Sequence, residues 1–352
     1  MAAYTTIDDP EAYFQTVLYT GNGSTQSITL PGDTNMQPDM VWIKVRNNTF
    51  NHYIFDAPRG VNLYMKPNQT AAEADGDPDH LTAFDSDGFS LGGTAGVNYD
   101  TAPFVAWCWK GGTTSGITTT GADITPSAYS FNQTSGVSII KYTGNGTSGA
   151  KIAHGLGAKP AFIVCMNTDT VENRMTFHHK NTSSPETDYL LLNTTAVTTD
   201  AARWNDSLPG TVYFEVDDND AANKSSDVIV AYCFAEKQGF SKCGSYTGNG
   251  NADGTFVYTG FKPAWVMFKR TDTTNNWLIF DNKRNGYNDG MEDLQANSTN
   301  AENESDRVDF LSNGFKIRKT DIVMNASGGT YIYMAFAEAP FVNSNGVPCN
   351  AR

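Results

Sequence analysis

The pentapeptide Tyr19-Thr20-Gly21-Asn22-Gly23 occurs three times in this chain, and its recurrence determines how the rest of the sequence is divided. Identical copies stand at residues 142–146 and 246–250, so successive copies start 123 and 104 residues apart. These intervals are the size of a domain and exceed the roughly 20–50 residues of a solenoid repeat. Asn-Gly favours a tight turn, because both residues tolerate a positive φ. We therefore expect three similar units, each with a first strand that runs into a hairpin turn at the pentapeptide.

The same landmarks follow each copy of the pentapeptide in the same order. A proline stands 19, 18 and 17 residues after the tyrosine and leads into an apolar run, at 40–44, 162–166 and 265–269. Proline is tolerated at the start of a strand, where its missing donor does little harm. Each unit closes on its most apolar strand, at 104–109, 228–234 and 331–336. Both faces of these strands are apolar, so we expect one face in a sandwich core and the other against a neighbouring domain or a second chain.

The pattern predicts an all-β protein of three tandem antiparallel β-sandwich domains, with jelly-roll or lectin-like architecture, because short strands alternate with turn clusters. We assign the first, second and third repeats to residues 12–112, 135–237 and 238–341. Residues 1–11 form an N-terminal arm, 113–134 a Gly/Thr/Ser-rich linker and 342–352 a C-terminal tail. The second repeat departs most from the common pattern. It lacks the Phe84-Asp-x-Asp-Gly-Phe89 hairpin motif and the Phe55-Asp56 pair, which the third repeat keeps in related form.

The charge and the cysteines narrow the classes of partner and compartment. A net charge of −14 argues against nucleic acid, which requires patches of Lys and Arg, and against adsorption to anionic lipid. No apolar run approaches the 18 residues of a membrane span, so no insertion into a membrane is expected. Cys108 and Cys233 share a strand position where the third repeat has Ala335, which indicates a small buried core slot and reduced thiols.

Candidate binding residues are few. Trp204 and Trp277 lie near loops and could stack on sugar rings, although such residues more often belong to the core. The acidic loop that holds Asp75, Asp77 and Asp79 could ligate Ca²⁺ through alternating carboxylates, or it could be an ordinary solvated loop. No nucleotide-binding loop and no nucleophile elbow is present in the sequence, and nothing singles out a carboxylate pair. We expect neither a catalytic residue nor a cofactor, apart from the Ca²⁺ candidate.

The chain resembles the repeated β-sandwich modules of marine tailed-bacteriophage virion proteins, of the tail-fibre or receptor-binding type. The segments that carry the resemblance span nearly the whole chain and include 6–10, 37–44, 84–89, 105–110 and 335–342. The resemblance implies a virion protein that is assembled in the host cytoplasm and contacts other virion proteins. It brings no catalytic motif with it.

Three functions follow from these expectations. The first is a non-enzymatic tail fibre or adhesin module that binds a glycan or receptor on the host surface as a homotrimer, since repetition multiplies weak contacts. The second is a structural virion protein, such as a capsid decoration, neck or tail component, that docks by its N-terminal arm. The third is a polysaccharide-degrading enzyme, which would need a pair of carboxylates in a cleft.

Overall fold

The computed structural model describes residues 3–76, 78–284, 288 and 291–349, and this part of the chain is all-β. Its strands form several antiparallel sheets. The only α-helices in the described ranges are two single turns, α1 (Ala95–Asn98) and α2 (Asp220–Asn223). Two 3-10 turns, η1 (Pro10–Ala12) and η2 (Pro185–Thr187), lie elsewhere in the chain. The predicted fold class is therefore confirmed at the level of an all-β, sandwich-like protein.

The three repeats contain nearly the same succession of strands, although the second has one extra strand at its start and one fewer in its short sheet. The first contains β1 (Phe14–Thr20), β2 (Gln26–Thr29), β3 (Met40–Val45), β4 (Tyr53–Asp56), β5 (Leu63–Tyr64), β6 (Ala74–Asp75), β7 (Leu81–Asp85), β8 (Gly88–Leu91) and β9 (Pro103–Trp109). The second contains β10 (Ala128–Asn132), β11 (Val137–Thr143), β12 (Ala150–Ala153), β13 (Phe162–Asn167), β14 (Met175–His178), β15 (Asp188–Leu191), β16 (Thr199–Asp200), β17 (Tyr213–Val216) and β18 (Val228–Phe234). The third contains β19 (Ser241–Thr247), β20 (Phe256–Tyr258), β21 (Phe261–Arg270), β22 (Trp277–Asp281), β23 (Glu292–Gln295), β24 (Asn303–Glu304), β25 (Val308–Leu311), β26 (Gly314–Ile317) and β27 (Thr330–Pro340).

Each repeat has one long sheet and one short sheet. The long sheets run β1-β9-β3-β4, β10-β11-β18-β13-β14-β15-β16 and β19-β27-β21-β22-β23-β24. The short sheets run β2-β8-β7, β12-β17 and β20-β26-β25, and β5 and β6 form a separate pair. The proline-led strand and the closing strand are neighbours in every long sheet. The predicted hairpins β7-β8 and β25-β26 are also present, with Phe84 opposite Phe89 and Phe310 opposite Phe315.

The pentapeptide does not form the predicted hairpin. β1 pairs with β9, whereas β2 pairs with β8, so the chain crosses from the long sheet to the short sheet at this point. A Cβ on Gly21 would lie 2.1 Å from the backbone oxygen of Tyr99, and Gly23 has a φ of 63°. The pentapeptide is therefore a corner between two sheets, where only glycine allows the close approach and the left-handed turn.

A fully buried asparagine holds each corner in place, and sequence reasoning missed it. The Asn98 side-chain oxygen accepts from the backbone N–H of Asn22 at 2.9 Å. Asn223 and Asn325 do the same for Asn145 and Asn249, at 3.0 and 2.9 Å. The pentapeptide tyrosines donate to the carbonyl just before each buried asparagine, in the pairs Tyr19–Val97, Tyr142–Ala222 and Tyr246–Met324. These bonds satisfy backbone groups that would otherwise be buried without partners.

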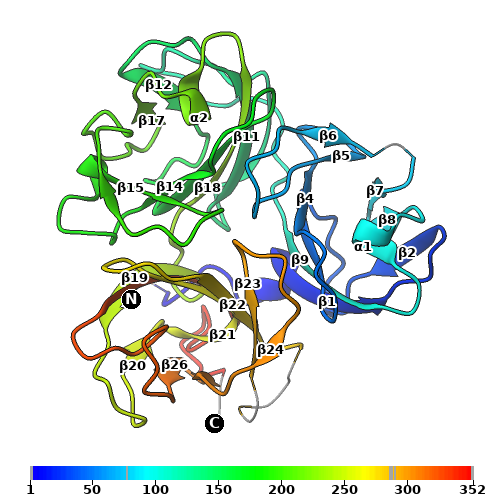
Figure 1. The fold of residues 1–352 in the computed structure, drawn as a ribbon, viewed down its shortest axis with the longest axis vertical. Coiled ribbons are helices and arrows are strands. Elements are labelled where there is room, and N and C mark those ends of the chain that lie inside the picture. The colour runs from blue at the N-terminus through cyan, green and yellow to red at the C-terminus, as the bar shows by residue number, and fades with distance from the viewer. Residues whose placement is uncertain (1–2, 77, 285–287, 289–290, 350–352) are drawn as a thin grey trace.

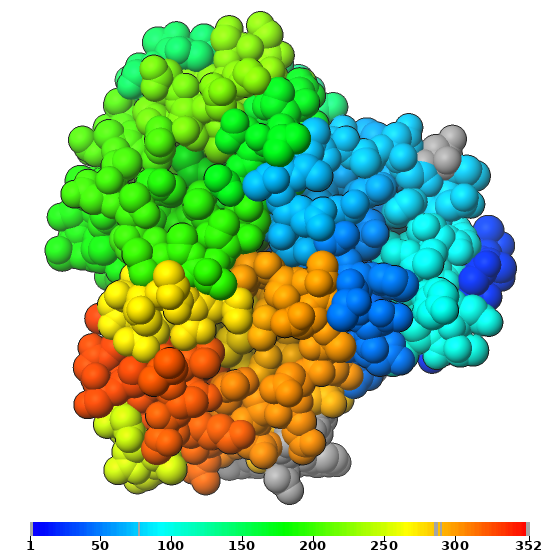
Figure 2. All heavy atoms as spheres, in the orientation of Figure 1, coloured from blue at the N-terminus to red at the C-terminus, as the bar shows by residue number. Residues whose placement is uncertain are grey.

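The three long sheets share one central core. On the closing strand β9, Phe104, Ala106 and Cys108 enter the core of the first repeat, whereas Trp107 and Trp109 enter the central core. The Trp109 ring centroid lies 6.3 Å from that of Phe234, 5.7 Å from that of Trp265 and 5.7 Å from that of Phe336, so it touches the other two repeats. The expectation that one strand face meets a neighbouring unit is confirmed. Figure 1 and Figure 2 show three lobes packed around this centre.

Equivalent backbone hydrogen bonds close the three repeats into a ring. In each case the amide of a loop in one repeat donates to a carbonyl just after the proline-led strand of the next. The donor–acceptor pairs are Glu73–Thr168 (2.8 Å), Thr198–Thr271 (3.1 Å) and Glu302–Arg46 (2.7 Å). Each repeat therefore contacts both of the others through the same backbone positions.

The predicted linker is wrong in part. β10 lies inside residues 113–134 and pairs with β11 along the edge of the second long sheet, and Ile124 bridges to Ile152. Phe131 is buried, which shows why this Gly/Thr/Ser-rich segment is ordered. The segment covers a sheet edge that would otherwise present unpaired backbone groups.

The described part of the N-terminal arm lies on the third repeat. The Tyr4 hydroxyl donates to the Gly260 carbonyl at 2.8 Å, and Ile7 is 2% exposed in the central core. The Asp8 carboxylate accepts from the Ser344 amide at 2.7 Å and so joins the arm to the C-terminal tail. The first and last described segments accordingly lie against the third repeat.

Candidate functional site

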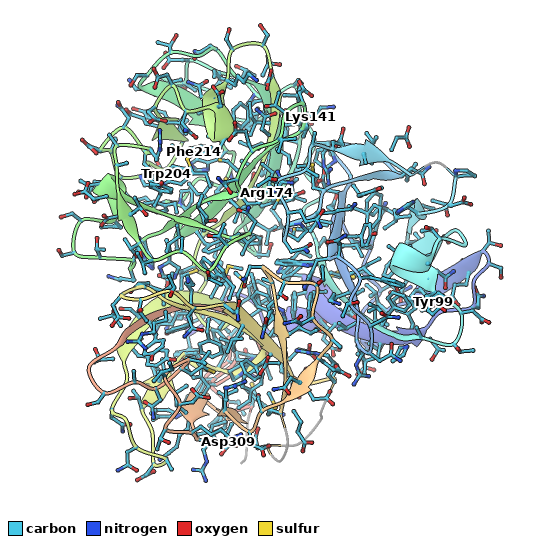
Figure 3. The ribbon with its side chains drawn as sticks, viewed as in Figure 1. Tyr99, Lys141, Arg174, Trp204, Phe214 and Asp309 are labelled. Carbon is cyan, nitrogen blue, oxygen red and sulfur yellow. The ribbon has the colours of Figure 1, made fainter. Side chains whose placement is uncertain are left out.

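The second repeat differs from the other two in its short sheet. That sheet has two strands, β12 and β17, where the first and third repeats each have three. The missing strand would correspond to β7 and β25, and irregular chain around Trp204 takes its place. Figure 3 shows Trp204 and Phe214 inside this lobe. The Trp204 ring centroid lies 5.5 Å from that of Phe177 and 6.3 Å from that of Phe214, so the indole fills the core that the hairpin would have filled.

The second difference is a buried ion pair that only the first and third repeats contain. Asp56 pairs with Arg59 and Asp281 pairs with Arg284, and all four side chains are inaccessible to solvent. The second repeat has His178 and Asn181 at these positions. The Nε2–H of His178 donates to the Tyr333 carbonyl at 3.0 Å, and its Nδ1 accepts from the Lys180 amide at 3.0 Å. Burial lowers the pKa of His178 to about 3, so the imidazole is neutral.

The ion pair is replaced in the second repeat because the neighbouring repeat offers no side-chain donor there. The Tyr232 hydroxyl donates to Asp56 at 2.7 Å, and the Trp107 indole N–H donates to Asp281 at 3.1 Å, each across a boundary between repeats. The corresponding position in the third repeat is Met334, which has no donor to offer. A carboxylate at position 178 would lose this partner, whereas the histidine bonds to a backbone carbonyl instead.

A cavity of about 460 Å³ opens beside these two differences. Its apolar lining comes from the residues that lead into β13, from β14, from η2 and from the loop that replaces the hairpin. It consists of Pro160, Ala161, Phe177, Pro185, Leu208 and Pro209. Its polar lining consists of Lys159, His179, Ser183, Glu186 and Glu236. This volume lies within the roughly 300–1,000 Å³ that is typical of small-molecule sites.

Two polar groups of the cavity are held by the third repeat. The ring Nε2 of His179 lies 2.9 Å from the Cys243 carbonyl oxygen, and Glu236 accepts from the Cys243 amide at 2.9 Å. The same His179 nitrogen is 3.7 Å from the Glu236 carboxylate. Both side chains remain partly exposed, at 25% and 39%, so they are oriented by the protein and accessible to a ligand.

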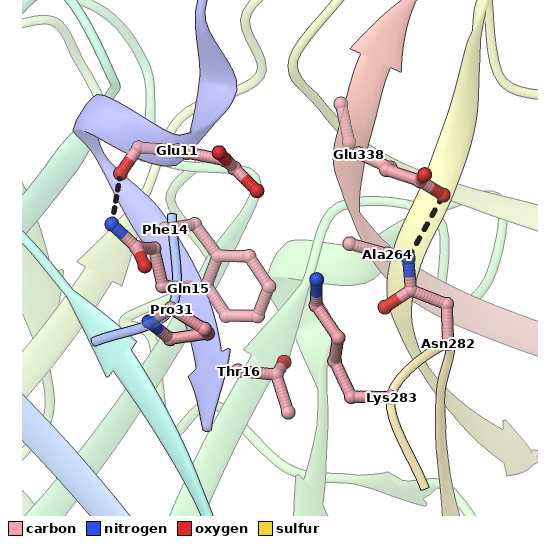
Figure 4. Close-up of a pocket in the computed structure, with 10 residues that line it drawn as sticks. Glu11, Phe14, Gln15, Thr16, Pro31, Ala264, Asn282, Lys283 and Glu338 are labelled. Carbon is pink, nitrogen blue, oxygen red and sulfur yellow. Dashed lines mark hydrogen bonds between the residues drawn. The ribbon is translucent and has the colours of Figure 1, made fainter. Parts of the chain in front are cut away.

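A second, much smaller void lies between the first and third repeats (Figure 4). Its volume is about 20 Å³, which suits one water molecule. The Gln15 amide donates to the Glu11 carbonyl at 2.9 Å, and the Asn282 amide donates to Glu338 at 2.8 Å. The buried Thr16 hydroxyl and the Asn282 side-chain oxygen also belong to residues that line the void and have no hydrogen-bond partner among the described residues, so a water molecule there would satisfy them.

The two tryptophans predicted to bind sugar are core residues. Trp204 is 0% exposed and Trp277 is 1% exposed, and the Trp277 indole N–H donates to the Leu191 carbonyl at 3.0 Å. Their positions near loops misled the prediction, because the loops fold over them. The tryptophans cannot stack on a ligand in this conformation, and that hypothesis is wrong.

The candidate Ca²⁺ loop is only partly described. Asp75 lies on β6 and is exposed, Asp79 is also exposed, and Asp77 lies outside the described residues. Among the residues that are described, no group of three or more His, Cys, Asp or Glu side chains could hold a metal ion. The four cysteines Cys108, Cys165, Cys233 and Cys243 are buried as free thiols, whereas Cys349 is exposed.

The chain belongs to the DUF7483 family, a domain of unknown function, which it matches over residues 9–340. Neither a curated protein nor a solved structure matches it. No helix in the described ranges is long and apolar enough to cross a membrane.

Sequence reasoning missed the cavity and its residues, including His179, Glu186, Leu208 and Glu236. The signal was nevertheless present in the comparison of the repeats. The two features that the second repeat lacks, the hairpin motif and the Phe-Asp pair, lie on the two elements that flank the opening. A departure from an internal repeat can therefore mark a specialised site.

Proposed function

We propose that this protein is a non-enzymatic bacteriophage virion protein of the tail-fibre or adhesin type, built of three lectin-like jelly-roll units, that binds the host surface. The observation that carries the proposal is the cavity of the second repeat, which opens where that repeat departs from the frame of the other two. The first and third repeats keep a three-stranded short sheet. The second repeat has a two-stranded one and opens a cavity of about 460 Å³. A rigid frame that positions one adaptable site is suited to recognition.

The ring of three repeats supports this role mechanically. Neighbouring repeats share a core that contains Trp107, Trp109 and Trp265, as well as the backbone bonds that close the ring. Burial of such large side chains contributes roughly 25 cal/mol per Å² of apolar surface. The repeats therefore act as one support that holds the cavity in a fixed position on the particle, whether or not copies further assemble into the expected homotrimer.

A structural virion role through a free N-terminal arm has less support. The described arm residues Tyr4, Ile7 and Asp8 already contact the third repeat and the C-terminal tail of the same chain. Detaching them would expose Ile7 and break these hydrogen bonds. An adhesin that is anchored through another surface does not require this rearrangement.

The test is binding of the purified chain to cells of the host bacterium and to their isolated envelope. We expect saturable binding at micromolar protein, and antibody labelling of the chain at the distal part of virion tails. Labelling confined to capsid or neck, without cell binding, would favour the structural role. Release of reducing sugar from host polysaccharide would establish an enzyme instead.

A further inference from the structure

We infer that the cavity of the second repeat binds a neutral saccharide, with one pyranose unit held between its apolar wall and its charged rim. This inference rests on the proposed binding function and specifies its ligand class. The cavity is defined above by its eleven lining residues.

The apolar wall suits the C–H faces of a sugar ring. Pro160, Pro185 and Pro209 are buried around the opening, and Leu208 stands at it with 52% of its surface exposed. Because these prolines are rigid, they hold the shape of the opening at little cost in conformational entropy. Because Leu208 is half-exposed beside this wall, a ligand that covers it removes apolar surface from water, and this favours binding.

The polar rim suits hydroxyl groups and disfavours an acidic ligand. Glu186 and Glu236 offer carboxylate acceptors to O–H donors, and Lys159 offers N–H donors to sugar oxygens. Carboxylate hydrogen bonds are among the stronger ones in proteins. Because the rim carries two carboxylates against one lysine and a histidine, it provides no excess of positive charge for an acidic ligand. The chain's net charge of −14 acts in the same direction.

Part of the rim is preorganised before any ligand arrives. Glu236 is oriented by the Cys243 amide at 2.9 Å, and His179 by the Cys243 carbonyl at 2.9 Å. Both contacts use the backbone of β19, which is itself paired with β27 in the third repeat. Fixed polar groups reduce the ordering entropy that a ligand would otherwise have to overcome.

The first and third repeats provide an internal comparison. Their hairpins β7-β8 and β25-β26 complete a three-stranded short sheet, whereas the second repeat has the loop with Leu208 and Pro209. The ligand should therefore bind one site per chain and not three. A stoichiometry of three would place binding at features common to all repeats.

The test is ligand-observed saturation-transfer NMR on the full chain. The probes are the methyl glycosides of glucose, galactose, mannose and N-acetylglucosamine, with glucuronic acid and glucosamine as charged comparators. We expect at least one neutral glycoside to bind with a Kd near 1 mM or tighter, at one site per chain, and more tightly than glucuronic acid, which the carboxylates of the rim repel.

Two exposed serines provide a matched pair of variants. Ser183 lines the cavity, whereas the adjacent Ser184 lies outside the lining and is also exposed. We expect Ser183→Trp to weaken the neutral glycoside at least tenfold by obstructing the opening, and Ser184→Trp to change it less than twofold. Unchanged thermal unfolding in both variants verifies that the fold is kept, and Leu208→Ala gives a second, smaller loss without added bulk.

The outcomes separate the ligand class from the proposed function. Tighter binding of a charged sugar, the absence of signal from all six probes, or equal losses in the two serine variants would overturn the inference. Cell binding that survives Ser183→Trp while glycoside binding is lost would place host attachment elsewhere and leave the saccharide site intact. Glycoside binding without any cell binding would overturn the proposed function alone.

Discussion

The first and second repeats place different chemistry at the same backbone position, and the difference shows how a repeated fold tolerates change. In the first repeat a buried Asp56 accepts from Tyr232 of the second repeat. In the second repeat the neutral His178 donates to the Tyr333 carbonyl of the third. Both keep a hydrogen bond across the boundary, although one uses a charged pair and the other a neutral ring. A hydrogen bond across the boundary is kept in both cases, and the residue type at this position depends on the donor or acceptor that the neighbouring repeat provides.

The largest effect should follow from removing the charged form of this contact. Asp56→Ala leaves the buried Arg59 guanidinium without its 2.5 Å carboxylate partner and leaves the Tyr232 hydroxyl without its acceptor. We expect a loss of about 3–5 kcal/mol in the free energy of unfolding, measured by urea denaturation. The exposed Asp218→Ala is the matched control and should change stability by less than about 0.5 kcal/mol. Equal effects of the two variants would show that the boundary pair is dispensable.

The converse substitution in the second repeat should also destabilise the protein, because it too leaves a buried charge without a partner. His178→Asp places a carboxylate where Asn181 replaces the arginine and Met334 replaces the donor. We expect a loss of about 3 kcal/mol at pH 7, because a buried charge is left unpaired. Burial would raise the pKa of the new carboxyl, so the loss should shrink as pH falls and the group becomes protonated. Adding Asn181→Arg and Met334→Tyr to His178→Asp should recover part of the stability. A single His178→Asp variant as stable as the parent protein would contradict this account.

A third comparison concerns a buried cation that the second repeat lacks. Lys44 donates to the Asn48 and Thr299 carbonyls at 2.9 and 3.1 Å, and the second repeat has Met166 at this position. Burial lowers the pKa of Lys44 to about 8. The unfolded chain keeps its proton up to about pH 10.4, so the parent protein gains stability as pH rises from about 8 to 10.4.

Lys44→Met removes that gain. Relative to the parent, the variant should therefore lose about 3 kcal/mol of stability between pH 7.5 and 10.5. Lys269, whose pKa burial also lowers to about 8, occupies the same place in the third repeat and should behave alike when replaced by Met. The exposed Lys180→Met is the control. A pH-independent difference for both buried lysines would refute the assignment.

The smallest effect should come from a feature that all three repeats share. The side-chain oxygen of Asn22 accepts from the Ser24 amide at 2.9 Å, and Asn145 and Asn249 make the same contact at 2.8 and 2.9 Å. We expect Asn→Ala at each site to reduce stability by about 1 kcal/mol, and by similar amounts, because these bonds are exposed and local. Differential scanning calorimetry of the three single variants measures this. A strongly unequal set would show that the corners differ despite their identical sequences.

The repeats, the strand positions and two hairpins could be predicted from the sequence. Proline-led apolar runs and Asp-Gly between aromatics act over a few residues, so their meaning does not depend on the rest of the chain. The pentapeptide turn was predicted as a hairpin because Asn-Gly usually forms one. The decisive partner, Asn98, lies 76 residues away, and no local pattern points to it.

The candidate site could not be predicted, because it is formed by contacts that neither the composition nor the spacing of the sequence reveals. Trp204 and Trp277 were predicted near a binding surface, and their burial follows from loops folding over them. The linker was predicted from its Gly/Thr/Ser content, although Ala128–Asn132 is a strand because β11 offers it an edge.

The amino-acid sequence alone determined that this is an all-β chain of three related units with an acidic surface and buried closing strands. It did so because alternation, turn chemistry and charge are local properties. Only the tertiary structure decided that the units close into a ring around one core, and that the second unit opens a cavity between Lys159 and Glu236. These features arise from residues that are distant in sequence, and packing brings them together.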